Sequence, residues 1–139
     1  MKTGRLIVAV LLISSILSGA GLAAEQGKKP FKAVIGKDGV QRVNISSGEY
    51  FFDPNYIAVK VNVPVEFIIK KDAGIISHNI IINAPYAGIN IREFLSTEPK
   101  TIKFTPAKTG SYPFYCDIKL LSFKTHKDKG MEGTLEVTE

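Results

Sequence analysis

The fold of this 139-residue chain is most constrained by a series of short, β-rich runs separated by Gly, Pro, Asn and Asp. Several runs alternate their side chains between two faces, as half-buried strands do. No long amphipathic helix interrupts them, so the pattern predicts an all-β antiparallel sandwich or barrel of about seven or eight strands. The predicted strands are Val40 to Ile45, Tyr56 to Val61, Val65 to Ile69, Asn79 to Ile82, Thr101 to Phe104, Ser111 to Cys116 and Thr134 to Val137.

Two segments do not follow this pattern. Phe51 to Asn55 is expected to turn the chain, because Asp, Pro and Asn favour turns. Pro85 to Pro99 has no steady period, and we expect a short helical turn around Ile91 to Leu95.

The N-terminus has the organisation of an export signal. A short basic start with Lys2 and Arg5 precedes an almost wholly apolar run from Leu6 to Leu17, and small residues follow up to Ala24. This pattern predicts a signal peptide over residues 1–23, with cleavage after Ala23 or Ala24, and export to the periplasm or the extracellular space. An uncleaved membrane anchor is the alternative, because the apolar stretch is just long enough to span a bilayer. After cleavage no membrane span would remain.

Composition limits what the exported chain can be. Two of the 18 Lys and Arg residues lie in the leader, so the mature chain with its 13 acidic residues carries a net charge of +3. No dense basic stripe with interleaved aromatic residues is present, which argues against nucleic-acid binding. We expect residues 24–39 to form a linker with a short first strand, and residues 40–139 to form one small domain, expected to be monomeric.

The mature chain contains one cysteine, two histidines and one methionine: Cys116, His78, His126 and Met131. A lone cysteine cannot form an internal disulfide, so it is buried and inert, paired with another chain, or a metal ligand. Two imidazoles and a thiolate with a weak thioether are the ligands of a mononuclear blue-copper site, which predicts one copper ion cycling between Cu(I) and Cu(II). The alternatives are a solvated histidine and a methionine that fills a gap in the core.

These residues lie in segments that resemble the cupredoxin family, including the copper domain of cytochrome oxidase subunit II. The resemblance rests on residues 52–60, on His78-Asn79, on the strand from Gly110 to Cys116, and on the stretch from Gly130 to Leu135. It implies a Greek-key β-sandwich with copper bound at one end. It also implies that Asn79 supports the site, with an amide that ties the His78 strand to the cysteine-bearing segment and donates toward the sulfur.

One feature departs from the family pattern. Nine residues, 117–125, separate the cysteine from the second histidine, and a binuclear site is excluded because it needs a second cysteine. The segment either covers an open end of the sandwich or forms a docking patch for a redox partner with an acidic surface. The residues of this patch would be Lys119, Leu120, Leu121, Phe123 and Lys124.

The function expected from these features is one-electron transport rather than catalysis. With both histidines assigned to the metal, no hydrolytic constellation remains, and no Gly-rich phosphate loop is present. A periplasmic copper-binding or copper-delivery protein is the alternative, although such proteins more often carry Met-rich or His-rich tracts. A copper enzyme with an open coordination position is a third hypothesis.

Overall fold

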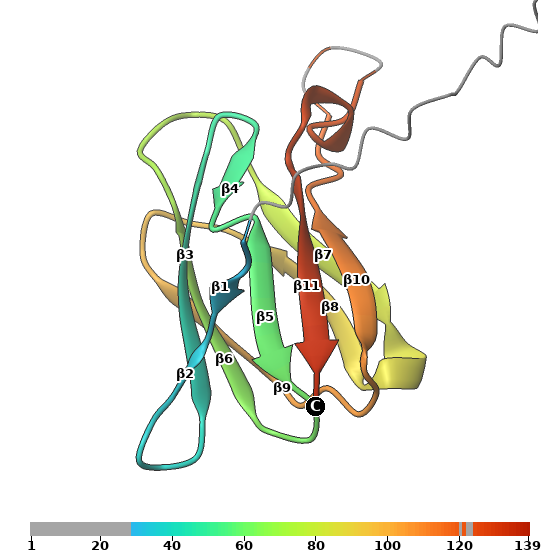
Figure 1. The fold of residues 1–139 in the computed structure, drawn as a ribbon. Coiled ribbons are helices and arrows are strands. Elements are labelled where there is room, and N and C mark those ends of the chain that lie inside the picture. Colours follow the sequence, from blue (N-terminus) through green and yellow to red (C-terminus); the bar gives the residue numbers. More distant parts are fainter. Residues whose placement is uncertain (1–28, 120, 122–123) are drawn as a thin grey trace, which may run out of the picture.

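The computed structural model describes residues 29–119, 121 and 124–139, so the predicted signal peptide lies outside the described residues. Over these ranges the chain has eleven strands, two short 3-10 helices and no α-helix. The strands form two sheets that pack face to face (Figure 1). The expectation of an all-β sandwich is therefore confirmed. Within the same ranges no helix is long and apolar enough to cross a membrane.

The first sheet has six strands and contains both ends of the described chain. Their spatial order is β1 (Phe31–Lys32), β5 (Tyr56–Lys60), β11 (Glu132–Thr138), β10 (Gly110–Tyr115), β7 (Asn79–Ala84) and β8 (Ile89–Phe94). The 3-10 helix η1 (Pro85–Ala87) connects β7 to β8.

The second sheet has five strands. Their order is β2 (Val34–Ile35), β3 (Gln41–Gly48), β6 (Val65–Lys71) and β9 (Lys100–Phe104), and β4 (Phe51–Asp53) also pairs with β3.

Both sheets are mixed rather than purely antiparallel. β5 runs parallel to β1 and to β11, and β3 runs parallel to β6. The chain passes from one sheet to the other between β5 and β6, so many neighbours within a sheet are distant in sequence. A hairpin would force two neighbours to be antiparallel, and strands that no hairpin joins can also pair in parallel.

The seven predicted strands coincide with β3, β5, β6, β7, β9, β10 and β11. β1 and β2 lie within residues 24–39, where one short strand was expected, and β4 and β8 were not anticipated. The predicted helical turn at Ile91 to Leu95 is wrong, because β8 continues to Phe94 as an edge strand paired with β7. Ile89 and Ile91 are buried while Asn90 and Arg92 are exposed, which is the period of a strand. β1, β2 and β4 have only two or three residues each, too few to show alternation.

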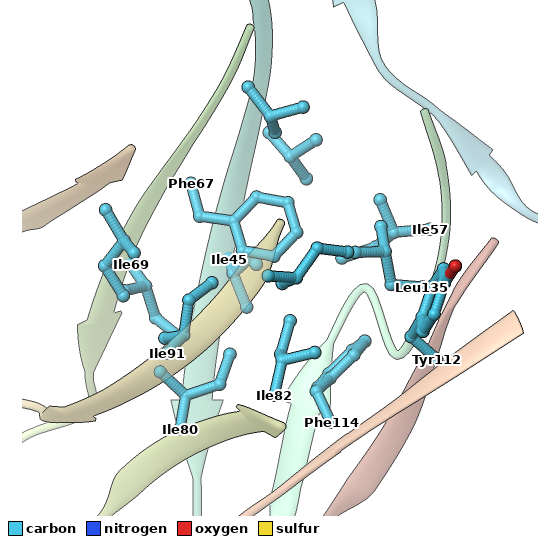
Figure 2. Close-up of a cluster of buried hydrophobic side chains, with 14 of the residues drawn as sticks. Ile45, Ile57, Phe67, Ile69, Ile80, Ile82, Ile91, Tyr112, Phe114 and Leu135 are labelled. Atoms are coloured by element: carbon cyan, nitrogen blue, oxygen red, sulfur yellow. The ribbon is translucent and has the colours of Figure 1, made fainter. Parts of the chain in front are cut away.

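The hydrophobic core lies between the two sheets (Figure 2). Phe67, Ile45 and Ile69 of the second sheet face Phe114 and Leu135 of the first, and all five side chains are at most 2% exposed. Cys116 and Met131 belong to the same core cluster. Cys116 and Met131 are thus held by a close-packed interior, which resists rearrangement.

Candidate metal centre

Three predicted ligands come together at one end of the sandwich. Nδ1 of His78 lies 3.2 Å from Nδ1 of His126, and the latter atom lies 3.4 Å from Sγ of Cys116. Donor atoms of the three side chains all lie within 4.8 Å of one another. His78 is 4% exposed, and Cys116 and His126 are fully buried. The arrangement is a compact N₂S donor set shielded from water.

Strand pairing places two of these residues. His78 immediately precedes β7, and Cys116 immediately follows β10. β7 and β10 are antiparallel neighbours, so the start of one strand and the end of the other meet at the same edge of the sheet.

Backbone hydrogen bonds place His126 in spite of the long segment that precedes it. The N–H of His126 donates to the carbonyl of Ile118 at 2.8 Å, and the N–H of Lys127 donates to the carbonyl of Cys116 at 2.9 Å. Lys119 and Thr125 also form an isolated antiparallel bridge. The base of the 117–125 loop is therefore closed, and the additional residues do not separate His126 from Cys116.

Met131 is anchored to the same two residues. Its N–H donates to the carbonyl of His126 at 2.9 Å, and its carbonyl accepts from the N–H of Cys116 at 3.1 Å. The turn between them includes the 3-10 helix η2 (Lys127–Lys129) and ends at Gly130, whose φ is +99°. The Met131 side chain is fully buried. The backbone thus holds Met131 next to the donor set.

The electrostatics of the metal-free site favour uncharged side chains. The pKa of His78 is lowered to about 4, mainly by burial and to a smaller extent by the neighbouring His126 and Lys71. Burial and Lys129 lower the pKa of His126, and burial raises the pKa of the Cys116 thiol. Both imidazoles are therefore neutral at pH 7, as ligation requires, and a bound cation would displace the thiol proton.

The donor set fits a transition-metal ion. Metal–nitrogen and metal–sulfur bonds of about 2.0–2.3 Å place neighbouring donor atoms roughly 3–4 Å apart. The N–N separation of 3.2 Å and the N–S separation of 3.4 Å fall in this range. One thiolate with two imidazoles suits copper in both of its common oxidation states.

Asn79 connects the histidine strand to the residue that follows the cysteine. Its side-chain amide donates to Oδ1 of Asp117 at 2.7 Å, and its Oδ1 accepts from the N–H of Asp117 at 3.1 Å. The backbone N–H of Asn79, rather than the amide expected from the sequence, lies 3.4 Å from Sγ of Cys116. The side chain is directed instead to Asp117, where it makes both of its hydrogen bonds.

Two contributors were missed at the sequence level, Asp117 and Arg92. Nη1 of Arg92, on β8, lies 3.0 Å from Oδ2 of Asp117, and so extends the Asn79 network to the edge strand. The position of Asp117 directly after the cysteine was the available signal. No such signal in the sequence pointed to Arg92, because β8 was not recognised as a strand.

Tyr50 is a third residue that the sequence did not indicate. Its ring packs edge-on against the ring of His126, with 5.0 Å between the ring centres. Nζ of Lys129 donates to the Tyr50 hydroxyl at 3.0 Å and lies 4.3 Å from the centre of that ring. Tyr50 therefore covers one side of His126, and Lys129 covers Tyr50.

The predicted docking patch is described only in part. Lys119, Leu121 and Lys124 are exposed, and the Leu121 side chain is fully open to solvent. Leu120 and Phe123 lie outside the described residues.

The sandwich and its buried N₂S cluster define a class of small β-proteins with a metal site at one end, and comparisons identify the family. The family model described as a cupredoxin-like domain matches residues 6–134. The chain therefore belongs to the cupredoxin-like family, as the sequence motifs indicated. A search of curated proteins finds no match.

Solved structures give the same fold. The metal-binding domain of the Cu(I)-exporting P-type ATPase CopA from Streptococcus pneumoniae D39 has a TM-score of 0.61 and 23% identity, over 80% of this chain and 97% of that one. Auracyanin A, a blue copper protein from Chloroflexus aurantiacus, has a TM-score of 0.54 and 19% identity, over 72% and 100%. Reduced auracyanin from Roseiflexus castenholzii has a TM-score of 0.50 and 25% identity, over 70% and 97%.

Proposed function

We propose that this protein binds one copper ion through His78, Cys116 and His126, with the thioether of Met131 as a further, weak ligand, and that it is a one-electron carrier. The observation that carries the proposal is the convergence of the two Nδ1 atoms and Sγ in a buried cluster. A copper ion held there would supply one-electron chemistry by alternating between Cu(I) and Cu(II).

The protein residues would contribute rigidity. Backbone hydrogen bonds fix His126 and Met131 to the cysteine segment, and the hydrophobic core holds Cys116. Donor atoms that cannot move far between oxidation states keep the reorganisation on electron transfer small. The blue copper protein auracyanin A has the same fold, which is consistent with this role.

Copper delivery is the second candidate, and one observation favours it. His78 forms part of the wall of a surface pocket, so one ligand lies next to solvent. A delivery protein must release its ion to a partner, which an open side of the site would assist. The structural likeness to the metal-binding domain of a Cu(I)-exporting ATPase also fits this candidate. At 23% identity this likeness is evidence of a shared fold.

The visible spectrum of the copper-loaded protein, followed by a potential titration, separates the two candidates. An electron carrier would show an intense thiolate-to-copper charge-transfer band that disappears and returns on reduction and reoxidation. A colourless Cu(I) form that resists oxidation would support delivery and contradict the carrier proposal.

We also propose that the 117–125 loop is the docking patch for a redox partner with an acidic surface. Lys119, Leu121 and Lys124 are exposed beside the site and combine apolar and basic side chains. Basic residues at the rim of an interface mainly set the association rate and its salt dependence. Lys119→Glu with Lys124→Glu should slow electron transfer to an acidic partner, most strongly at low ionic strength, with an unchanged spectrum. Loss of the spectrum with unchanged transfer kinetics would show that the loop is only a cover.

The proposed setting of this activity is the periplasm or the extracellular space, with the protein acting as a monomer. The basis for the proposed location is the leader-like N-terminal sequence, which precedes the described residues. The mass of the mature protein in a culture's periplasmic or secreted fraction would test both cleavage at residue 23 or 24 and export.

A further inference from the structure

The four proposed ligands differ in their access to solvent. Cys116, His126 and Met131 have no exposed surface, whereas His78 is 4% exposed. A metal ion that enters the folded protein must first meet a ligand that solvent can reach. His78 is the only one of the four that meets this condition.

His78 also lies in the wall of a surface pocket of about 250 Å³, the His78 pocket. The loop between β6 and β7 and the turn between β3 and β4 form the rest of its wall. These two segments lie at the same end of the sandwich as the turn before β11 (top in Figure 1). The pocket therefore brings solvent to His78, whose Nδ1 lies next to His126.

The imidazole of His126, in contrast, is covered by neighbouring side chains. The Tyr50 ring packs against His126, and the ammonium group of Lys129 lies over that ring. Nε2 of His126 is buried and has no hydrogen-bond partner among the described residues. His126 therefore presents no exposed surface to solvent, unlike His78.

The charges around the His78 pocket suit a cation. Glu49 and Asp72 are exposed acidic residues of its wall. Lys71 also belongs to the wall, so two acidic residues face one basic residue there, and its ammonium group donates to the carbonyl of Gly74 at 2.7 Å. Acidic groups at the mouth of a cleft raise the local concentration of cations.

We propose that the metal ion reaches and leaves the site through the His78 pocket, with His78 as the first ligand to bind and the last to release. This inference rests on the proposed copper-binding function. It applies equally to an electron carrier, which must be loaded once, and to a delivery protein, which must also unload.

The test narrows the pocket and measures the rates of copper exchange. Ala73, which is exposed in the pocket wall, is replaced by tryptophan. Leu121→Trp is the matched control, because Leu121 is a fully exposed apolar residue of the 117–125 loop and is not part of the pocket wall. Uptake is measured with aqueous Cu(I) supplied as a weak chelate, and release with an excess of a chromophoric Cu(I) chelator. The chelator colour reports both rates whatever the colour of the protein.

Ala73→Trp should slow uptake and release by about tenfold each, because a barrier raised by about 1.4 kcal/mol acts equally in both directions. The dissociation constant should stay unchanged, and Leu121→Trp should exchange copper as fast as the wild type. The proposal is overturned if Ala73→Trp exchanges at the wild-type rate, or if Leu121→Trp slows exchange as much.

A charge variant provides a second measurement that does not depend on how the loop accommodates tryptophan. Glu49→Gln with Asp72→Asn should slow uptake at low ionic strength and leave release nearly unchanged, since it removes only the attraction at the mouth. If this variant takes up copper at the wild-type rate at every ionic strength, the proposed route is contradicted. Failure of the wild-type protein to bind one copper per chain would instead refute the proposed function.

Discussion

The two imidazoles of the site are buried with their Nδ1 atoms in contact, and this arrangement tolerates little positive charge. Burial is the main cause of the lowered pKa of His78, about 4 in the metal-free protein, and His126 and Lys71 add repulsion. Asp72 opposes them weakly. A free histidine has a pKa of about 6.5, so the unfolded chain takes up protons that the folded chain refuses.

We therefore predict that the metal-free protein loses stability as the pH falls from about 6.5 toward 4. Above this window both states hold a neutral His78, and within it the unfolded state binds more protons, so its free energy falls relative to the folded state. Urea unfolding of metal-free protein at several pH values between 7.5 and 5 measures the effect. The variant His78→Gln with His126→Gln is the control and should show a flatter profile, whereas identical slopes in both proteins would refute this explanation.

Asn79 joins two elements, β7 and the segment after β10, through two hydrogen bonds to Asp117. It is 1% exposed, and its loss removes two hydrogen bonds to the half-buried Asp117. We predict that Asn79→Ala lowers the free energy of unfolding of the metal-free protein by about 1–3 kcal/mol. Asn44→Ala, at an exposed position of β3, is the control and should change it by less than about 0.5 kcal/mol. Equal, small effects of both substitutions would show that the link is not structural.

Arg92 brings the edge strand β8 into this network through its ion pair with Asp117. Both side chains are more than one-third exposed, so the pair should contribute little to stability. Its charge, however, lies beside the cysteine segment, and removal of a positive charge favours the more oxidised metal. We predict that Arg92→Gln lowers the reduction potential of the copper-loaded protein. Lys100→Gln is the control, because it removes the ion-pair partner of Glu93, a neighbour of Arg92 on β8, and it should leave the reduction potential unchanged. Equal shifts of the potential in both variants would contradict a specific role of Arg92.

At the scale of elements, the sequence was sufficient for strands such as β5 and β6. β5 and β6 have buried residues at every second position and were predicted close to their observed bounds. β8 was mistaken for a helical turn because Glu93 and exposed Phe94 at a sheet edge break the apparent period. The parallel pairs could not be predicted, since they join strands that no short turn connects.

At the scale of the whole molecule, sequence spacing left the site uncertain because nine residues separate Cys116 from His126. The structure explains why the spacing is compatible with a compact cluster. Hydrogen bonds from His126 to Ile118 and from Lys127 to Cys116 close the loop at its base. The fold thus positions the imidazole through backbone pairing, which sequence spacing alone does not reveal.

The central claim of this account is that two imidazoles and one thiolate from distant parts of the chain bind the same copper ion. X-ray absorption at the copper edge of the loaded protein tests it most directly, because it counts sulfur and nitrogen neighbours of the metal. We predict one sulfur at about 2.2–2.3 Å and two nitrogens at about 2.0 Å, values close to those of other transition-metal sites with these ligands. The sulfur contribution should vanish in Cys116→Ala. A wild-type spectrum with only oxygen and nitrogen neighbours, or one that Cys116→Ala leaves unchanged, would contradict the claim.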